Sequence, residues 1–351
     1  MDLNELILFD NLCATYTPGQ TVTGRVVIGI DSPKKIRGIK LVFKGEADTY
    51  FSQWKKCINV NGRLISKTQK LTGHEKYFEA SSYLIESALG KELVLKPGIH
   101  EYKFSFRLPH NLPSSVELAY GHIRYTTTAI IERPWKSDQE FKTFFTVVSD
   151  FGLNLHQNGL VSVQTEAKWD LSRFCCISRP LSINISVPTR VYVPGQTISI
   201  KVNVENESGK WVDAVKLILQ KVITYSATTP RKDRKIMKEK IVGVSAGPIG
   251  DKQIISYEQK LVVPPLLASN LQNGGIIHFE YELTVEACIQ GGTTHTFEEG
   301  TPIYISTVPF SDDQKPQPPT SKVQEFMQQP SAPEEHLLNS QQNIQPICRL
   351  R

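Results

Sequence analysis

Cysteine is scarce in this sequence. Six cysteines occur in 351 residues, and no two of them form a C-x-x-C pair. Compact zinc and redox motifs are built from such pairs, so the spacing excludes a cysteine-based metal or redox motif. We therefore expect six reduced, structural thiols, no bound metal and no cofactor.

Long hydrophobic runs are also missing. The N-terminal region carries Asp2 and Glu5 and only a four-residue apolar run, residues 6–9, before Asp10, which does not fit a secretory signal. No uninterrupted apolar stretch approaches the ~20 residues of a membrane helix. The chain is 40% hydrophobic and 21% charged, with a mean hydropathy of −0.25. We expect a globular cytoplasmic protein.

Three common motifs for nucleotide binding and zinc-dependent proteolysis are absent. The chain has no G-x-x-x-x-G-K-[ST], no G-x-G-x-x-G and no H-E-x-x-H, and its eight histidines are scattered singly. The net charge of +5 is too small to indicate nucleic-acid binding. The sequence therefore predicts no catalytic residue, no enzyme activity and no nucleic-acid partner.

An internal repeat is the most informative feature present. When the sequence is shifted by 176 positions, residues 16–43 lie over residues 192–219, and ten of the 28 pairs are identical. Average composition would give roughly two identities. A weaker match at offsets of 155 and 154 places about 22 additional residues within the first copy. The repeat therefore predicts two homologous domains, and the additional residues lie in the middle of the first domain.

Within each copy, apolar residues recur with a period of two. Ile198, Ile200, Val202 and Val204 alternate with polar residues, as expected for a strand with one buried face. The dipeptides Pro18-Gly19 and Pro194-Gly195 suit the centre of type II turns. The pattern predicts an all-β fold of two tandem immunoglobulin-type β-sandwiches. Only residues 75–87 leave a helix as an alternative to a strand.

The expected domain organisation follows from these patterns and from composition. Residues 1–150 form the first sandwich, residues 151–178 a linker and lead-in, and residues 179–309 the second sandwich. Residues 310–351 are rich in Gln and Pro and have too few apolar residues for a core, so we expect a disordered tail.

One cluster of positive charge rises above the background. Six basic residues fall within ten positions, against two acidic ones: Arg231, Lys232, Arg234, Lys235, Lys238 and Lys240. We expect this stretch to form a hairpin or loop. A loop kept soluble by its charges is the favoured interpretation, and a binding site for phosphorylated tails or anionic lipid is the functional alternative. A second basic set lies at Lys34, Lys35, Arg37, Lys40 and Lys44, of which Lys40 and Lys44 are expected on an outward sheet face.

Several ordered blocks resemble the α-arrestins, the arrestin domain-containing family. Those of the first copy are Phe9-Asp10-Asn11, Tyr16-Thr-Pro-Gly-Gln-Thr-Val-Thr-Gly24, Gly45-Glu-Ala47, Leu95-Lys-Pro-Gly-Ile-His100 and Tyr120-Gly-His-Ile-Arg-Tyr125. Those of the second are Cys175-Cys176, Tyr192-Val-Pro-Gly-Gln196, Val263-Pro-Pro265 and Pro302-Ile-Tyr-Ile-Ser-Thr-Val-Pro309. The resemblance covers residues 3–309 and implies two arrestin-like β-sandwich domains.

The resemblance also implies a function. Such a chain is a non-catalytic adaptor that binds cytoplasmic tails of receptors or transporters, associates peripherally with plasma membrane or endosomes, and promotes ubiquitination, endocytosis or endosomal sorting. Tails of the family usually carry P-P-x-Y motifs for ubiquitin ligases. This sequence has none, so any ligase would be reached through an intermediary. A retromer-like trafficking scaffold without a ubiquitin link is the alternative.

Overall fold

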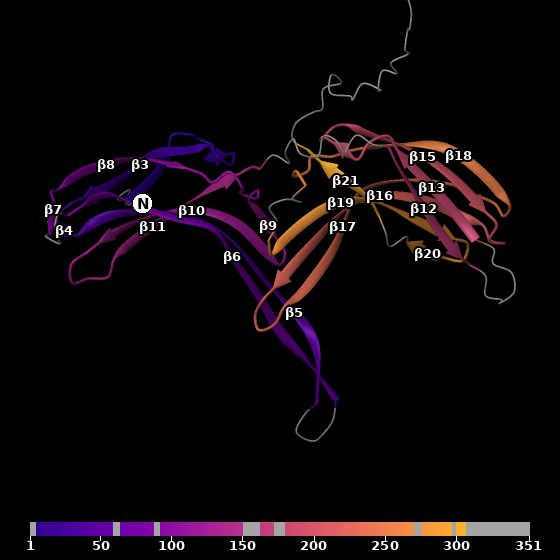
Figure 1. The fold of residues 1–351 in the computed structure, drawn as a ribbon, viewed down its shortest axis with the longest axis horizontal. Coiled ribbons are helices and arrows are strands. Elements are labelled where there is room, and N and C mark those ends of the chain that lie inside the picture. Colours follow the sequence, from indigo (N-terminus) through magenta and orange to yellow (C-terminus); the bar gives the residue numbers. More distant parts are fainter. Residues whose placement is uncertain are drawn as a thin grey trace, which may run out of the picture. The chain divides into compact units, whose positions relative to one another are not determined.

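Figure 1 shows the fold in a computed structural model of the chain. The structure describes residues 5–58, 64–87, 92–149, 162–171, 180–269, 275–296 and 300–306. All the described residues belong to one compact unit. All regular elements of the described residues are β-strands, which confirms the predicted all-β class, and no helix among them could cross a membrane.

The first sandwich is built from strands β1 to β11. They are β1 (Glu5–Phe9), β2 (Thr15–Tyr16), β3 (Thr21–Ile30), β4 (Lys34–Ile36), β5 (Gly38–Ile58), β6 (Leu64–Glu86), β7 (Leu93–Leu95), β8 (Gly98–Arg107), β9 (Val116–Leu118), β10 (Gly121–Glu132) and β11 (Gln139–Val147). One sheet has the order β1-β3-β8, and the facing sheet has the order β2-β11-β10-β5-β6 with β9 beside β10. Strands β4 and β7 form a small separate pair.

The second sandwich is built from strands β12 to β21. They are β12 (Val163–Asp170), β13 (Pro180–Val187), β14 (Val191–Tyr192), β15 (Thr197–Asn206), β16 (Val212–Ala227), β17 (Asp233–Ala246), β18 (Gln253–Val262), β19 (Ile277–Ile289), β20 (Thr293–Thr296) and β21 (Thr301–Ile305). Its sheets have the orders β12-β13-β15-β18 and β14-β21-β19-β16-β17, with β20 beside β19.

The sheet orders confirm the internal repeat. Strands β13, β15 and β18 follow the same order as β1, β3 and β8, and β14-β21-β19-β16-β17 matches β2-β11-β10-β5-β6. In both copies the short strand before the Pro-Gly turn pairs in parallel with the last strand of its sheet. Gly19 and Gly195 have positive φ angles of 79° and 85°, as the predicted turns require. The fold is therefore one architecture used twice.

Each sandwich core follows from the alternation. In β15, Ile198, Ile200, Val202 and Val204 are fully buried, whereas Lys201 and Glu205 face solvent. The inner face of the first sandwich is aromatic: Phe43 stacks on Phe106 with ring centroids 4.4 Å apart. Burial of such alternating apolar faces supplies most of the driving force for pairing the sheets.

The structure decides between helix and strand at residues 75–87, and it revises the expected linker. Residues 75–87 lie almost wholly in strand β6, so the helical alternative is wrong. The expected linker, residues 151–178, contains strand β12, which pairs with β13 in the second sandwich. The apolar alternation of β12 is too short to be recognised beside its polar neighbours. The expected tail, residues 310–351, lies outside the described residues.

We predict that Phe43→Ala lowers the free energy of unfolding by about 3–5 kcal/mol, because it removes a buried ring and leaves a cavity. Phe144→Ala is the matched control: its ring is 55% exposed, so the loss should stay below about 1 kcal/mol. Urea denaturation followed by circular dichroism measures both. Equal losses for the two variants would contradict this account of the core.

Candidate functional site

The basic stretch of the second sandwich lies in the β16–β17 hairpin. Arg231 and Lys232 stand in its turn region, while Arg234, Lys235, Lys238 and Lys240 lie on β17. The expected hairpin is therefore present, but most of the stretch is strand rather than loop. Strand β17 is the last strand of its sheet. Its backbone register with β16 fixes where each cation points.

Several of these cations are already engaged by neighbouring groups. Lys238 Nζ lies 2.9 Å from Glu282 Oε1, Lys240 Nζ lies 2.5 Å from Glu286 Oε1, and Arg231 pairs with Asp233 at 2.7 Å. Lys235 Nζ lies 4.5 Å from the centroid of the Tyr120 ring. Among the described residues only Lys232 and Arg234 of the six lack both kinds of contact. Part of the predicted site is thus structural.

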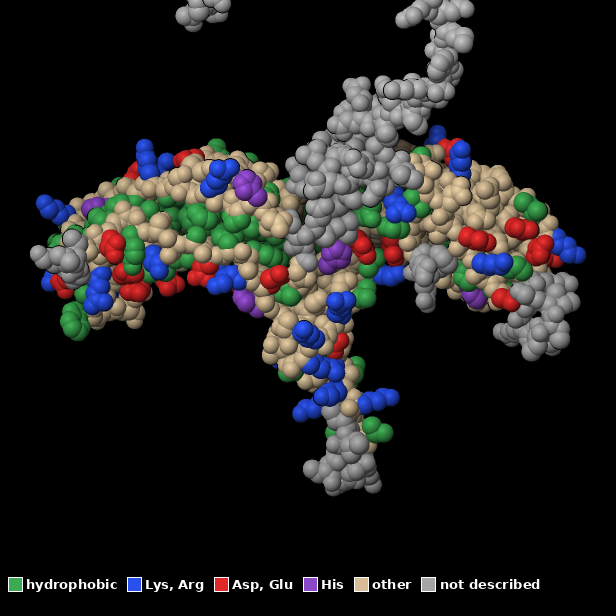
Figure 2. All heavy atoms as spheres, viewed as in Figure 1, with side chains coloured by type: hydrophobic (Ala, Val, Ile, Leu, Met, Phe, Trp, Pro, Cys, Tyr) green, Lys and Arg blue, Asp and Glu red, His purple; other side chains and the backbone are tan. Residues whose placement is uncertain are grey.

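A second basic element comes from the long β5–β6 hairpin. Strands β5 and β6 contain 21 and 23 residues, against 16 and 14 for the equivalent β16 and β17. No Asp or Glu occurs between Asp48 and Glu75, whereas Lys55, Lys56, Lys67 and Lys70 are all exposed. Figure 2 shows Lys and Arg side chains in blue along the projecting hairpin. The distal part of the hairpin, between Asp48 and Glu75, therefore carries positive charge and no acidic side chain.

The same hairpin exposes large apolar side chains. Trp54 is 76% exposed, Leu64 74% and Ile65 43%. Register places Lys55 directly opposite Lys67, an arrangement in which like charges disfavour strand pairing. Exposed aromatic and aliphatic groups among lysines are typical of surfaces that bind membranes or acidic partners. Exposed positive charge and exposed apolar side chains thus occur together on one hairpin.

Direct hydrogen bonds bring the hairpin next to β17. Gln53 Nε2 donates to the carbonyl oxygen of Arg234 at 3.1 Å. The backbone of Thr72 accepts from Thr228 and Thr229 and donates to the Thr229 carbonyl, all at 2.9 Å. Thr49 Oγ1 donates to the Ser226 carbonyl at 2.7 Å. The lysines named above on the hairpin and the cations Lys232 and Arg234 are hereafter the basic surface.

The contact between the hairpin and the second sandwich is close, and Gly73 makes this approach possible. A side chain at Gly73 would lie 2.6 Å from the carbonyl oxygen of Ser226, too close for a carbon atom. Glu75 Oε2 accepts a 3.0 Å hydrogen bond from the backbone N–H of Ile276. The rings of Tyr120 and Tyr225 meet edge-on with centroids 5.6 Å apart, and burial raises the pKa of Tyr225 to about 12. The contact is thus polar, aromatic and tightly fitted.

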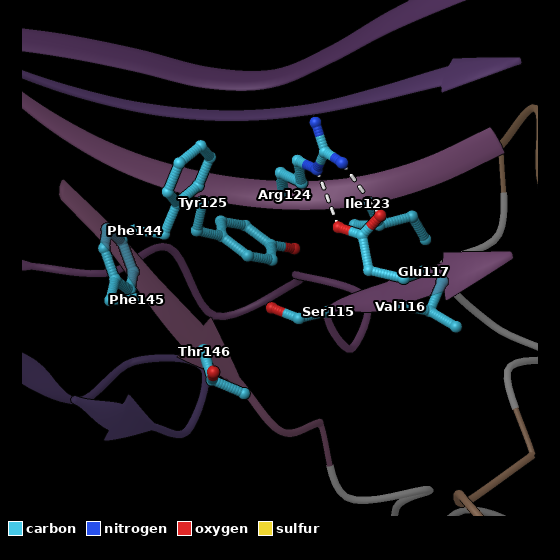
Figure 3. A pocket seen from close by; sticks show the side chains of 9 residues that line it. All are labelled: Ser115, Val116, Glu117, Ile123, Arg124, Tyr125, Phe144, Phe145 and Thr146. Atoms are coloured by element: carbon cyan, nitrogen blue, oxygen red, sulfur yellow. Dashed lines mark hydrogen bonds and ion pairs between the residues drawn. The ribbon is translucent and has the colours of Figure 1, made fainter. Parts of the chain in front are cut away.

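An open pocket of about 650 Å³ lies on the first sandwich beside β9, β10 and the end of β11 (Figure 3). Arg124 lines the pocket and is held by Glu117, with Nε to Oε1 at 2.6 Å and Nη2 to Oε2 at 2.9 Å. This hydrogen bonding lowers the pKa of Glu117. The Arg124 guanidinium also lies 5.9 Å from the Phe144 ring centroid. The pocket holds no reactive pair among its lining residues.

One stretch of β17 matches a catalytic motif. Residues 243–247 read G-x-S-x-G, the pattern of a nucleophile elbow, which requires a strand, a sharp turn and a helix. Here Ser245 lies inside β17, paired with Lys216 of β16, and no helix occurs in the described part of the chain. The geometry is that of an ordinary edge strand. Ser245 is therefore no candidate nucleophile.

The remaining expectations have simple outcomes. Lys40 and Lys44 do lie on the outward face of β5, half-buried, and Lys44 pairs with Glu46. Cys13 and Cys288 are free thiols, and the side chains of the other four cysteines lie outside the described residues. The lysines of the β5–β6 hairpin were not singled out from sequence, since they are spread over 16 positions. The missing acidic residues between Asp48 and Glu75 were the available signal.

Comparison with known proteins identifies the architecture. The profile described as "Arrestin (or S-antigen), N-terminal domain" matches residues 6–154, and "Arrestin (or S-antigen), C-terminal domain" matches residues 178–310. Together they cover well over half of the chain. The chain belongs to the arrestin domain-containing family. The two sandwiches are its arrestin N and C domains.

Curated relatives agree with this assignment. Arrestin domain-containing protein 17 of Caenorhabditis elegans is 28% identical over 315 residues, which is 86% of this chain and 70% of the relative. Arrestin domain-containing protein 4 of Mus musculus is 27% identical over 308 residues, 87% and 72% of the two chains. Arrestin domain-containing protein 1 of Rattus norvegicus is 25% identical over 276 residues, 77% and 57%. This arrestin domain-containing chain therefore has the arrestin-type adaptor architecture.

We predict that Glu75→Ala loosens the contact between the arrestin N and C domains. Hydrogen bonds to charged groups contribute about 1.5–3 kcal/mol, so exchange of the Ile276 amide should accelerate by roughly 10- to 150-fold. Glu79→Ala is the control, because Glu79 lies on the same strand and pairs with Lys76 of that strand at an exposed position. Unchanged protection of Ile276 in Glu75→Ala would show that this bond does not hold the contact.

Proposed function

We propose that this chain is a non-catalytic adaptor that binds the cytoplasmic tails of receptors or transporters at a membrane surface. The observation that carries the proposal is the basic surface, in which the distal part of the β5–β6 hairpin, which has no Asp or Glu between Asp48 and Glu75, adjoins Arg234 of β17. The two arrestin domains supply the support for this surface. Membrane-protein tails and inner-leaflet lipids are the anionic partners that such a surface would meet.

In this proposal, positive charge and exposed apolar side chains make separate contributions to membrane binding. Lysines near an anionic leaflet contribute about 1 kcal/mol each to binding. Trp54 and Leu64 add apolar area at the membrane interface, where aromatic side chains are favoured. The protein would then work in the cytoplasm, with peripheral association to plasma membrane or endosomes. Cargo tails would be bound while the hairpin rests against lipid.

Downstream of binding, the adaptor would promote ubiquitination, endocytosis or endosomal sorting of its cargo. Because the sequence has no P-P-x-Y motif, ligase recruitment would use an intermediary protein rather than a WW domain. The same absence favours the second candidate, a retromer-like trafficking scaffold with no ubiquitin link. Both candidates use the basic surface, and they differ in the partner proteins that the chain would recruit.

The lipid step predicts a defined charge dependence. Replacing Lys67, Lys70, Lys232 and Arg234 by alanine should weaken binding to vesicles containing phosphatidylserine by at least about thirty-fold, from about 1 kcal/mol per cation and partial additivity. Co-sedimentation at low salt measures the loss. The control replaces Lys201 and Lys260, which are exposed on the other sheet of the arrestin C domain. Equal weakening by both sets would leave only a net-charge effect.

The cellular role predicts a defined set of neighbours. Proximity labelling with the full chain, followed by mass spectrometry, should recover receptors or transporters together with ubiquitin ligases. A chain ending at Pro309 should lose the ligases and keep the cargo, if residues 310–351 recruit the intermediary. Labelling dominated by coat or retromer-type components, unchanged on truncation, would select the scaffold instead. Recovery of neither cargo nor coat components would overturn the adaptor proposal.

A further inference from the structure

A strained turn at the end of strand β10 exposes a tryptophan to solvent. Trp135 lies between β10 and β11, has a φ of 59° and is 93% exposed. Such a positive φ is rare for a residue other than glycine and is an outlier for a bulky side chain. Pro134 precedes it, so the tryptophan occupies the position that a type II turn normally gives to glycine. The turn therefore holds a large apolar side chain in solvent at a cost in backbone strain.

The second copy of the fold makes the equivalent turn without this strain. Strand β19 takes the place of β10 in its sheet, and a turn connects it to β20. In that turn Gly291 and Gly292 have positive φ angles of 93° and 84°. Glycine adopts this conformation at no steric cost. The architecture itself therefore needs no tryptophan here, and the strain at Trp135 points to a role outside folding.

Arg133 fixes the shape of the turn. Its backbone N–H donates to Asp138 Oδ1 at 3.2 Å, and its Nε donates to the carbonyl oxygen of Ser137 at 2.8 Å. The ring of Pro134 locks the φ angle of the residue before the tryptophan. The indole is thus presented by a preorganised turn, so little conformational freedom is lost when it binds.

The surroundings of Trp135 favour a lipid surface over a protein groove. Its neighbours Lys136, Ser137 and Asp138 are exposed and polar. An aromatic anchor in a protein interface is normally ringed by contacts that exclude water, over roughly 800 Å² on each partner. A single indole on a polar turn instead suits the bilayer interface, where the ring enters among the headgroups and its N–H stays hydrogen-bonded. Residues 133–138 contain two cations and one acid, so anionic lipid does not repel them.

The turn lies at the opposite end of the sheet from the hairpin tip. Register pairs Gly38, the first residue of β5, with Glu132, the last residue of β10, whereas Trp54 lies near the other end of β5. From residue 38 to residue 54 the strand covers about 50 Å, at about 3.3 Å per residue. In Figure 1 the hairpin and the β10–β11 turn both extend toward the lower side of the view. One flat surface can therefore touch both.

We propose that Trp135 is a second membrane anchor, which enters the bilayer interface while the basic surface binds anionic lipid. This inference rests on the lipid-binding step of the proposed function and adds a contact that uses no residue of the basic surface. Once one contact has formed, the other forms within the same complex, so the two together bind more tightly than either alone. Two separated contacts also fix how the arrestin N domain is turned toward the membrane.

The test is co-sedimentation of the full chain with vesicles of phosphatidylcholine and phosphatidylserine. Trp135→Asn should weaken binding by at least about tenfold, because half of an indole accounts for about 100 Å² of buried apolar surface. Asparagine adopts positive φ angles more readily than tryptophan, so the urea midpoint of this variant should be unchanged or higher. Trp211→Asn is the matched control: Trp211 is 52% exposed directly before β16, in the arrestin C domain, and its loss should leave vesicle binding unchanged.

Tryptophan fluorescence tests insertion directly. In a Trp54→Phe chain, brominated phosphatidylcholine should quench the emission, and adding Trp135→Asn should remove most of that quenching. Unchanged vesicle binding by Trp135→Asn, or equal weakening by Trp211→Asn, would overturn the second anchor and leave the proposed function standing. Weakening by Trp135→Asn but not by the four-cation variant would support this anchor and contradict the basic surface. Absence of vesicle binding by the full chain would overturn both.

Discussion

The backbone hydrogen bonds between Thr72 of β6 and residues Thr228 and Thr229 are the constraint on which the rest of the structure depends. They satisfy polar groups at a site too tight for a side chain at Gly73, and they hold the β5–β6 hairpin against the turn between β16 and β17. Backbone groups leave little freedom in such a contact, because each lost bond leaves a donor or acceptor unpaired. The basic surface exists because both hairpins meet here.

Much of this fold could be predicted from the sequence, because its signals are local and periodic. Ile198, Ile200, Val202 and Val204 alternate with polar residues and are all buried. Gly19 and Gly195 occupy turns that only glycine adopts easily. The repeat at an offset of 176 residues maps β2 and β3 exactly onto β14 and β15. Periodicity and turn chemistry survive in a single sequence because they need no knowledge of distant partners.

The candidate sites were harder to predict, because they depend on strand pairing. From the sequence alone, Lys238 and Lys240 would be taken for free cations. The pairing of the strands places them beside Glu282 and Glu286. Sequence reveals which residues face outward, but register between distant strands decides which of them meet.

The central claim is that the arrestin N and C domains jointly form one surface for an anionic partner. Hydrogen–deuterium exchange of the intact chain, with and without vesicles containing phosphatidylserine, tests it most directly. The account predicts that vesicles slow exchange in residues 64–70 and in residues 232–238 together, while residues 197–206 of β15 stay unchanged. Protection of only one of the two hairpins, or protection centred on β15, would contradict it.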